Sequence, residues 1–467
     1  MSVHDLTALE QAAAIRSGQL TAVELAEHYL ARGESVPGAY VVLTPDVAIE
    51  QARAADAAVA AGQATGELFG VVCPVKDLNF MVGANTRMGS AVFDLTSYED
   101  DYVVKAMRDA GLVFTGKTTT PEFGLPCYTE PEPQVSAPAR CVWDRRRTAG
   151  GSSGGAAVAV ASGLAPIAHG SDGGGSIRIP ASANGLVGIK PSRGRVSNGP
   201  IRDPIGDLVT SGPLARTVAD AAALLDVMAV AYPGDPFHAP PPRGSFLAAS
   251  RGPIGSLRVG VLTEPIIADV AVAPESIAAV ERTARWLDEL GHETVAIGRP
   301  FGPDLVAQFE AVWHTLALLT PVMPDDEARL QPLTRHLRDL GREVSGIQLA
   351  MAVSLLRIQA RATLTQWAQF DAVVMPTVNG VAPLVEDIVD RENPAQDFEN
   401  QKRWAAFTAA FNMTGQPAVS LPLHWTADGL PVGVMLVGKM FDEELLIGLA
   451  AQLEQAHPWT DRKPEAW

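Results

Sequence analysis

Cysteine is scarce in this chain, with only Cys73, Cys127 and Cys141 among 467 residues. They form no C-x-x-C pair, and the sequence has no H-E-x-x-H motif and no cluster of histidines and carboxylates. Three scattered cysteines give neither a disulfide framework nor zinc-ligand spacing, so nothing indicates an oxidising compartment. We therefore expect a protein that uses neither a metal ion nor a cofactor.

Positive charge and long apolar runs are also lacking. The chain has 36 Lys and Arg against 53 Asp and Glu, a net charge of −17, which argues against a nucleic-acid or anionic membrane partner. The longest apolar run, residues 156–168, is broken by Gly163 and Pro166 and falls short of the roughly 18 residues that span a bilayer. The first residues, Met1 to Asp5, lack the basic and apolar regions of an export signal. We predict a soluble, cytoplasmic protein.

Strand-like and helix-like segments alternate through much of the chain. Residues 1–66 have helical spacing, whereas short β-branched runs separated by helical segments fill residues 67–230 and 370–460. This order predicts an α/β fold with a single large mixed, mostly parallel sheet flanked by helices. Residues 231–369 are expected to form a Pro/Gly-rich linker and a mainly helical segment over the core. The helical segment either forms a wall of a substrate pocket or only covers one face of the sheet. We expect residues 1–467 to form one domain.

Glycine and serine are concentrated in two stretches. Residues 150–155 read Gly-Gly-Ser-Ser-Gly-Gly, and residues 170–176 read Gly-Ser-Asp-Gly-Gly-Gly-Ser. Glycine at this density lets the backbone approach a ligand closely and leaves backbone N–H groups free to converge on an anion. Serine becomes a usable nucleophile only when a base takes its proton, so the function depends on where that base lies.

A histidine base is one alternative. Residues 151–155 satisfy G-x-S-x-G, the nucleophile elbow of α/β-hydrolases, and would make Ser153 the nucleophile of a Ser-His-Asp esterase. However, residues 144–149 make a poor preceding strand, and the later histidines lie scattered with no neighbouring signature. A P-loop and an S-x-x-K motif are both absent.

Lys76 offers a different base. It follows Val71, Val72 and Val75, so we expect it to be buried, and burial lowers the pKa of a lysine because the ammonium loses its solvation. Asp77 would oppose this effect, unless it points to the opposite face of the strand as adjacent residues do. Without the two serine stretches, a lysine reaching solvent from a strand end would be the simpler interpretation. With them, the sequence favours a Ser–Lys arrangement.

Three motifs in order carry a family resemblance. They are residues 75–77 (Val-Lys-Asp), 150–155 and 171–178, at matching spacing, and further similar segments lie at 116–124, 185–192, 212–214 and 411–418. With them the chain resembles the amidase signature family over nearly its whole length. The resemblance implies a Ser–cisSer–Lys triad: Ser176 as nucleophile, Ser152 as proton relay after a cis peptide bond from Gly151, and neutral Lys76 as base.

The resemblance also implies how the negative charge of the reaction is held. Backbone N–H groups of Gly173, Gly174, Gly175 and Ser176 would form the oxyanion hole. Asp172 and Arg178 would organise the site from behind, although a purely structural role is equally open for them.

The function implied is an amidase that hydrolyses the C–N bond of small-molecule, linear amides through an acyl-enzyme on Ser176. An alternative is the A-type subunit of a glutamine-dependent tRNA amidotransferase, but residues 204–210 lack the Ser-Leu-Asp stretch common in that subunit. Residues 129–132, 163–169 and 458–459 resemble hydrolases of cyclic ω-amino-acid dimers. The oligomeric state stays open, with a homodimer as one option.

Overall fold

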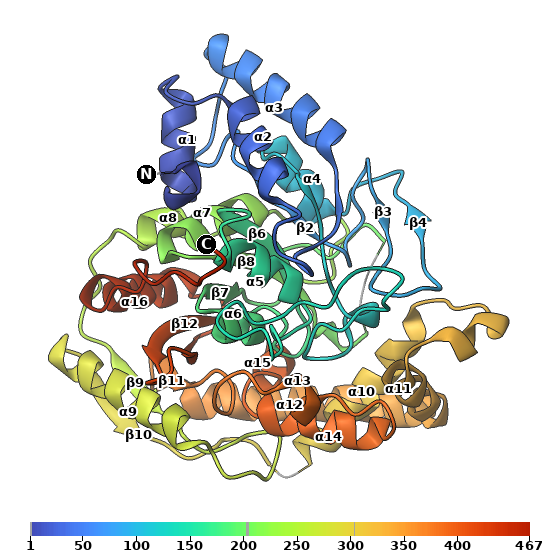
Figure 1. The fold of residues 1–467 in the computed structure, drawn as a ribbon. Coiled ribbons are helices and arrows are strands. Elements are labelled where there is room, and N and C mark those ends of the chain that lie inside the picture. Colours follow the sequence, from blue (N-terminus) through green and yellow to red (C-terminus); the bar gives the residue numbers. More distant parts are fainter. Residues whose placement is uncertain (1, 202–204, 303) are drawn as a thin grey trace.

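A large mixed sheet runs through the molecule (Figure 1). The computed structural model describes residues 2–201, 205–302 and 304–467. Within these residues the sheet has eight strands: β6 (Ile167–Asp172), β7 (Val187–Lys190), β8 (Thr210–Ala215), β9 (Arg258–Val261), β10 (Glu293–Ala296), β11 (Ala372–Pro376), β12 (Ala418–Trp425) and β13 (Pro431–Gly438). Their order across the sheet is β10-β9-β11-β13-β12-β7-β8-β6.

The direction of the strands differs from the prediction. The α/β class and the large mixed sheet flanked by helices are confirmed, but the expectation of mostly parallel strands is wrong. Among the described strands, β9 pairs in parallel with β10 and β11, whereas the other five neighbouring pairs are antiparallel. A short turn at residues 426–430 joins β12 to β13 as a hairpin, and β8 lies antiparallel between β6 and β7. Alternating strand and helix segments do not reveal such returns, because a helix can also connect strands that are not neighbours.

Helices surround this sheet. Those with regular α-geometry in the described residues are α1 (Ala8–Arg16), α2 (Ala22–Arg32), α3 (Pro45–Ala60), α4 (Tyr102–Asp109), α5 (Gly154–Ala161), α6 (Arg178–Asn184), α7 (Val218–Met228), α8 (Phe246–Ala249), α9 (Pro274–Glu289), α10 (Leu305–Leu319), α11 (Pro332–Glu343), α12 (Gly346–Trp367), α13 (Val385–Ile388), α14 (Pro394–Trp404), α15 (Ala410–Thr414) and α16 (Glu443–Ala456). Short 3₁₀ turns are η1 (Val3–Asp5), η2 (Glu122–Gly124), η3 (Ile205–Asp207) and η4 (Pro324–Arg329). No helix within the described ranges is long and apolar enough to cross a membrane.

The two faces of the sheet belong to two hydrophobic cores. Along β13, Val434 and Leu436 pack into the core that α7, α9 and α16 share, whereas Met435 and Val437 pack into the core of α10, α12 and α15. This split follows from the strand period of two, which sends successive side chains to opposite faces. A strand buried on both faces therefore reads as a continuous apolar run. Figure 1 shows α10, α11, α12 and α14 gathered as one layer at the lower edge of the view.

A second, smaller sheet carries the lysine of interest. It consists of β1 (Tyr40–Leu43), β5 (Gly116–Thr118) and β2 (Val75–Lys76), in the order β1-β5-β2. A separate ribbon pairs β3 (Asn85–Thr86) with β4 (Leu95–Thr96). Residues 67–230 thus supply strands to more than one sheet. The N–H of His169 on β6 donates to the carbonyl of Pro74 at 3.1 Å, which ties the small sheet to the large one beside β2.

Candidate active site

Lys76 and Ser152 meet in a buried polar cluster at the seam between the two sheets. The Nζ of Lys76 lies 2.8 Å from Ser152 Oγ, 3.0 Å from Ser171 Oγ and 3.2 Å from the Ser171 carbonyl oxygen. The Lys76 side chain is 0% exposed and Ser152 is 2% exposed, so the predicted burial of this lysine is confirmed. The peptide bond between Gly151 and Ser152 is cis, as the family resemblance implies.

Asp77 points away from this cluster. Its carboxylate forms an ion pair with Lys117 at 2.8 Å, with both side chains fully buried, and accepts backbone N–H groups of Arg87 and Met88 at 3.1 and 3.0 Å. Burial raises the pKa of Asp77, while Lys117 and these hydrogen bonds act in the opposite direction. The negative charge next to Lys76 in sequence is therefore directed to a different lysine in space.

His169 supports Lys76 from behind. Its Nδ1 accepts the backbone N–H of Lys76 at 3.3 Å, so Nε2 carries the ring proton and donates it to Ser211 Oγ at 3.2 Å. Burial, the largest cause, lowers the pKa of His169 to about 3. The ring is therefore neutral near pH 7 and adds no positive charge beside the lysine. Nothing in the sequence around this histidine indicated the role.

Ser153 does not have the surroundings of an esterase nucleophile. Its Oγ donates to the carbonyl of Ser171 at 3.2 Å and accepts the N–H of Ser171 at 3.3 Å. No histidine is among its hydrogen-bond partners in the described residues. The structure gives no support to a Ser-His-Asp site at Ser153.

Ser176 lies between the glycine loop that follows β6 and the start of α6. The backbone N–H of Ser153 donates to the carbonyl of Ser176 at 3.1 Å, which brings the two glycine–serine stretches together one residue from Ser152. Ser176 is 7% exposed and lines a pocket together with Gly174. The structure therefore brings together Lys76 and Ser152 directly, and Ser176 through the neighbouring backbone.

The glycine loop differs in detail from the expectation that all its amides are available to a ligand. The N–H of Gly175 donates to Asp172 Oδ1 at 2.8 Å. In contrast, the amides of Gly173, Gly174 and Ser176 have no hydrogen-bond partner among the described residues.

Position 175 of this loop can be occupied only by glycine. Its φ is +136°, and an added Cβ would lie 2.3 Å from Thr408 Oγ1. Both the backbone conformation and the close approach exclude a side chain. Thr408 in turn donates its hydroxyl to the carbonyl of Gly174 at 2.7 Å and so holds the same loop.

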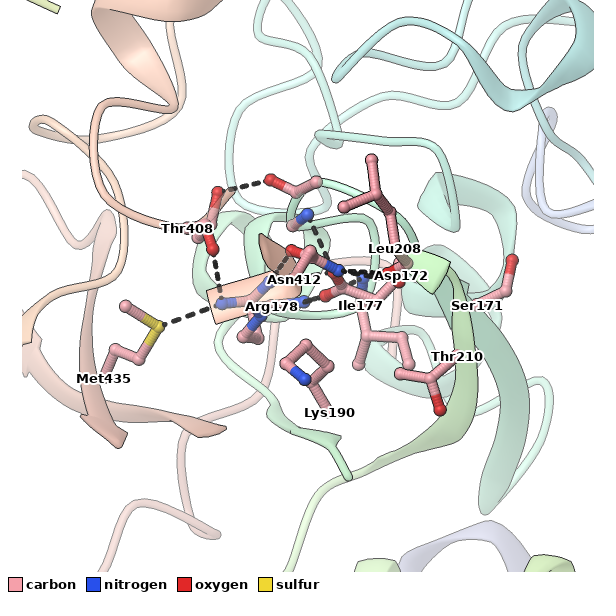
Figure 2. A network of polar contacts seen from close by, with 12 residues as sticks. Ser171, Asp172, Ile177, Arg178, Lys190, Leu208, Thr210, Thr408, Asn412 and Met435 are labelled. Atoms are coloured by element: carbon pink, nitrogen blue, oxygen red, sulfur yellow. Dashed lines mark hydrogen bonds and ion pairs between the residues drawn. The ribbon is translucent and has the colours of Figure 1, made fainter. Parts of the chain in front are cut away.

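A buried network of polar contacts lies directly behind this loop (Figure 2). Asp172 and Arg178 form a bidentate ion pair, with Nη2 to Oδ1 at 2.8 Å and Nε to Oδ2 at 3.0 Å, and both side chains are 0% exposed. Arg178 also donates to the carbonyl of Thr408 at 2.9 Å and to Asn412 Oδ1 at 2.6 Å. The Nδ2 of Asn412 donates to Asp172 Oδ1 at 2.9 Å and to the Leu208 carbonyl at 3.0 Å. The network therefore fixes the loop to α15.

The charges of this network shift two pKa values. Burial acts to raise the pKa of Asp172, but the ion pair and hydrogen bond with Arg178 outweigh it and hold that pKa well below its usual range. Burial, and next Arg178, lower the pKa of Lys190 well below its usual range. Lys190 is 1% exposed, donates to the carbonyl of Pro191 at 2.9 Å and is drawn beside Arg178 in Figure 2.

The pocket at Ser176 has mainly apolar walls. Phe309 and Trp313 of α10 stack with ring centroids 5.3 Å apart, and both line the pocket. Of the two roles open to the segment over the core, part of it therefore has the first, as a pocket wall. The sequence did not indicate the other residues of the pocket wall. They include Leu125, Cys127, Ile179, Phe398, Gln401 and Lys402.

A small hydrogen-bond chain holds one side of this pocket. Gln401 accepts the backbone N–H of Cys127 at 2.8 Å and donates to Asp397 Oδ1 at 2.6 Å, while the Tyr128 hydroxyl donates to Asp397 Oδ2 at 2.9 Å. Burial raises the pKa of Asp397 to about 6. The carbonyl of Tyr128 lies only 2.5 Å from where a Cβ on Gly151 would be, so this wall also packs against the peptide that carries Ser152.

The family to which this chain belongs agrees with a site built from lysine and serine side chains. The described residues contain no group of three or more His, Cys, Asp or Glu side chains that could hold a metal ion. The family model described as Amidase matches residues 24–447. The chain belongs to the amidase family. Its predicted membership of the amidase signature family is confirmed, and it is a hydrolase of amide C–N bonds.

Named relatives of this amidase cover almost its whole length. It is 36% identical over 482 residues to the 6-aminohexanoate-cyclic-dimer hydrolase of Paenarthrobacter ureafaciens, with 98% of this chain and 96% of the relative covered. A solved structure of 6-aminohexanoate cyclic dimer hydrolase superposes with a TM-score of 0.89 at 32% identity, covering 100% and 99% of the two chains. The native peptide amidase of Stenotrophomonas maltophilia gives a TM-score of 0.81 at 27% identity, with 98% of each chain covered. The weaker likeness to cyclic-dimer hydrolases is therefore also confirmed.

Proposed function

We propose that this amidase works through a triad of Lys76, Ser152 and Ser176. The observation that carries the proposal is the set of three oxygens around the buried Lys76 Nζ. A neutral amine has two N–H groups and one lone pair. In the structure Nζ donates to Ser152 Oγ at 2.8 Å and to the hydroxyl and carbonyl oxygens of Ser171. When the amine is neutral, its two N–H groups keep the Ser171 oxygens, and its lone pair takes the Ser152 proton along the same contact.

The acylation step follows from this arrangement. Ser176 Oγ attacks the amide carbonyl carbon and gives its proton to Ser152 Oγ, while the Ser152 proton passes to Lys76 Nζ. When the tetrahedral intermediate collapses, the same relay returns the proton to the amine nitrogen and the C–N bond breaks. An ester between the acyl group and Ser176 remains.

Deacylation uses the relay a second time. Water attacks the ester carbonyl, its proton passes through Ser152 to Lys76, and the proton then returns to Ser176 as the carboxylic acid leaves. The free amidase is thereby regenerated with no cofactor or metal ion consumed.

The oxyanion is assigned to three amides of the glycine loop. We propose the N–H groups of Gly173, Gly174 and Ser176, because that of Gly175 is already bonded to Asp172. Each such donor is typically worth about 3–4 kcal/mol in the transition state. Asp172 and Arg178 act through the backbone of this loop and have no contact with the substrate in this mechanism.

The substrate class we propose is small amides with a largely apolar acyl part, and linear amides in particular. The apolar pocket walls support this class, while the relatives' names include both cyclic-dimer and peptide substrates. We further propose a cytoplasmic protein with residues 1–467 as one domain and no nucleic-acid partner, supported by the net charge of −17 and the three free cysteines.

The test is a panel of linear amides, cyclic amides and matching esters, assayed with wild type and Lys76→Ala. We expect wild type to hydrolyse simple linear amides as a lone chain, and Lys76→Ala to lose at least about 10²-fold in kcat on amides. Activity that requires glutamine or a partner chain would instead favour the amidotransferase role. Unchanged kcat in Lys76→Ala would contradict the triad.

A further inference from the structure

One wall of the Ser176 pocket carries a charged group. Lys402, from α14, is the only charged side chain among the described residues that line this pocket. Its Nζ lies 2.6 Å from Glu310 Oε1 on α10 and 2.5 Å from Glu399 Oε1 on α14. The Lys402 side chain is 16% exposed, so the ammonium sits at the wall and not in bulk solvent.

These three groups together are negative. Burial acts to lower the pKa of Lys402, but the two carboxylates outweigh it and raise that pKa, so the lysine stays charged near neutral pH. One ammonium faces two carboxylates, which leaves one unit of negative charge. His314, one turn after Glu310 on α10, does not cancel it, because burial lowers the pKa of its ring.

The polar side chain next to Lys402 in the wall is already occupied. The side chain of Gln401 is bonded to Cys127 and Asp397, and the remaining lining side chains near Lys402 are apolar, with the Phe398 ring centroid 5.4 Å from its Nζ. Charges interact more strongly beside apolar walls than in water. Lys402 lines the pocket, and the two carboxylates lie behind it at 2.6 and 2.5 Å from its Nζ. A charged group on a bound substrate would therefore experience the summed charge of all three groups with little competing polarity.

We propose that Glu310, Lys402 and Glu399 form a charge filter that sets the substrate preference of this amidase. The filter favours amides whose distal end is uncharged or carries an ammonium group, and disfavours amides that carry a carboxylate there. This inference rests on the proposed function, because it assigns the selectivity of the same Ser176 pocket. It predicts that an ammonium end is preferred over a carboxylate end by about tenfold or more in kcat/KM.

The test uses acyl p-nitroanilides that differ only in their distal group: methyl, ammonium or carboxylate, each on four- and six-carbon chains. The variant is Glu310→Gln with Glu399→Gln, which leaves Lys402 as an uncompensated cation. We expect kcat/KM for the carboxylate series to rise about tenfold, chiefly through KM. The ammonium series should fall by a similar factor, and the methyl series should stay within about twofold.

Three controls separate the filter from other effects. Glu392→Gln changes an exposed carboxylate just before α14 and should leave all three series unchanged. A second substrate series carries the charged group on the amine part instead of the acyl part. The series whose kcat/KM depends on the charge identifies the half of the amide that faces the cluster. High salt should narrow the difference between the ammonium and carboxylate series, because salt screens partly exposed charges.

Two outcomes would overturn the filter. If all series change by one common factor in the double variant, the glutamates have only a structural role. If neither half of the substrate responds to charge, the cluster does not face the bound amide. Either result leaves amide hydrolysis itself intact, whereas loss of all hydrolysis in wild type would contradict the proposed function instead.

Discussion

The protonation state of a few buried side chains governs this site. Lys76 is surrounded by hydroxyl and carbonyl oxygens, and the neighbouring charge of Asp77 is paired with Lys117. His169, which accepts the backbone N–H of Lys76, is held neutral by burial. Burial favours the uncharged form of a lysine, and a lysine must be uncharged to act as a base.

His169 should make the protein sensitive to acid. Its folded pKa of about 3 lies below the unfolded value of about 6.5, so its stabilising effect is present above pH 6.5 and is lost as pH falls toward 3. We expect wild type to lose up to about 2 kcal/mol more stability than His169→Gln between pH 7 and pH 5. Urea unfolding at both pH values measures the difference. Equal losses in the two proteins would show that His169 does not titrate as described.

At the scale of elements, sequence periodicity located the regular segments well. The β-branched runs expected within residues 370–460 correspond to β11, β12 and β13. The mainly helical segment expected within residues 231–369 contains α9 to α12, although β9 and β10 of the large sheet also lie there. Sequence periodicity missed β8, whose Gly212-Pro213 pair disfavours a strand, and α6, which is short and buried on all sides and so has no amphipathic pattern.

The same limit applies to the site. The resemblance to the amidase signature family implied Lys76, Ser152 and Ser176, because the motifs that carry this resemblance are local in sequence. Pocket walls from α10 and α14 carry no such signal, since Trp313 and Gln401 reach Ser176 only through the fold. The sequence also does not show that the amide of Gly175 is bonded to Asp172, because the four neighbouring glycine and serine amides are equivalent in sequence.

The glycine loop as an element should tolerate no side chain at Gly175. In Gly175→Ala the Cβ would meet Thr408 Oγ1 at 2.3 Å in a backbone conformation with φ +136°. We expect kcat to fall at least about 10²-fold as the oxyanion donors shift, with a stability loss of about 1–3 kcal/mol. Steady-state kinetics and thermal unfolding measure the two effects.

Gly18→Ala is the matched control for this prediction. Gly18 has φ +73° but no atom within 4 Å of an added Cβ, so it reports backbone strain without a clash and away from the site. It should lose some stability and keep its kcat. A Gly175→Ala protein with the kcat of Gly18→Ala would contradict the assigned role of the loop.

At the scale of the whole molecule, the two ends of the chain meet. The indole N–H of Trp467 donates to Asp5 Oδ1 at 3.0 Å, Lys463 also pairs with Asp5, and the Arg216 guanidinium lies 4.3 Å from the Trp467 ring centroid. These contacts join the C-terminal segment to the turn before α1 and to the end of β8.

Trp467→Ala should therefore loosen the N-terminal helices without affecting catalysis. We expect a stability loss of about 1–2 kcal/mol from the lost hydrogen bond and cation–π contact. Proteolysis should cut the first 20 residues faster, and kcat/KM should stay within about twofold. A large drop in kcat/KM with unchanged proteolysis would mean that the C-terminal residues act on the site.

The most direct measurement of the central claim is the position of a covalent label. An acyl-enzyme mimic, formed with a fluorophosphonate probe, is digested and located by mass spectrometry in wild type and in Lys76→Ala. The account predicts a single label on Ser176 in wild type, formed at least about 10²-fold more slowly without Lys76. A label on Ser152 or Ser153, or labelling of Ser176 at an unchanged rate in Lys76→Ala, would contradict it.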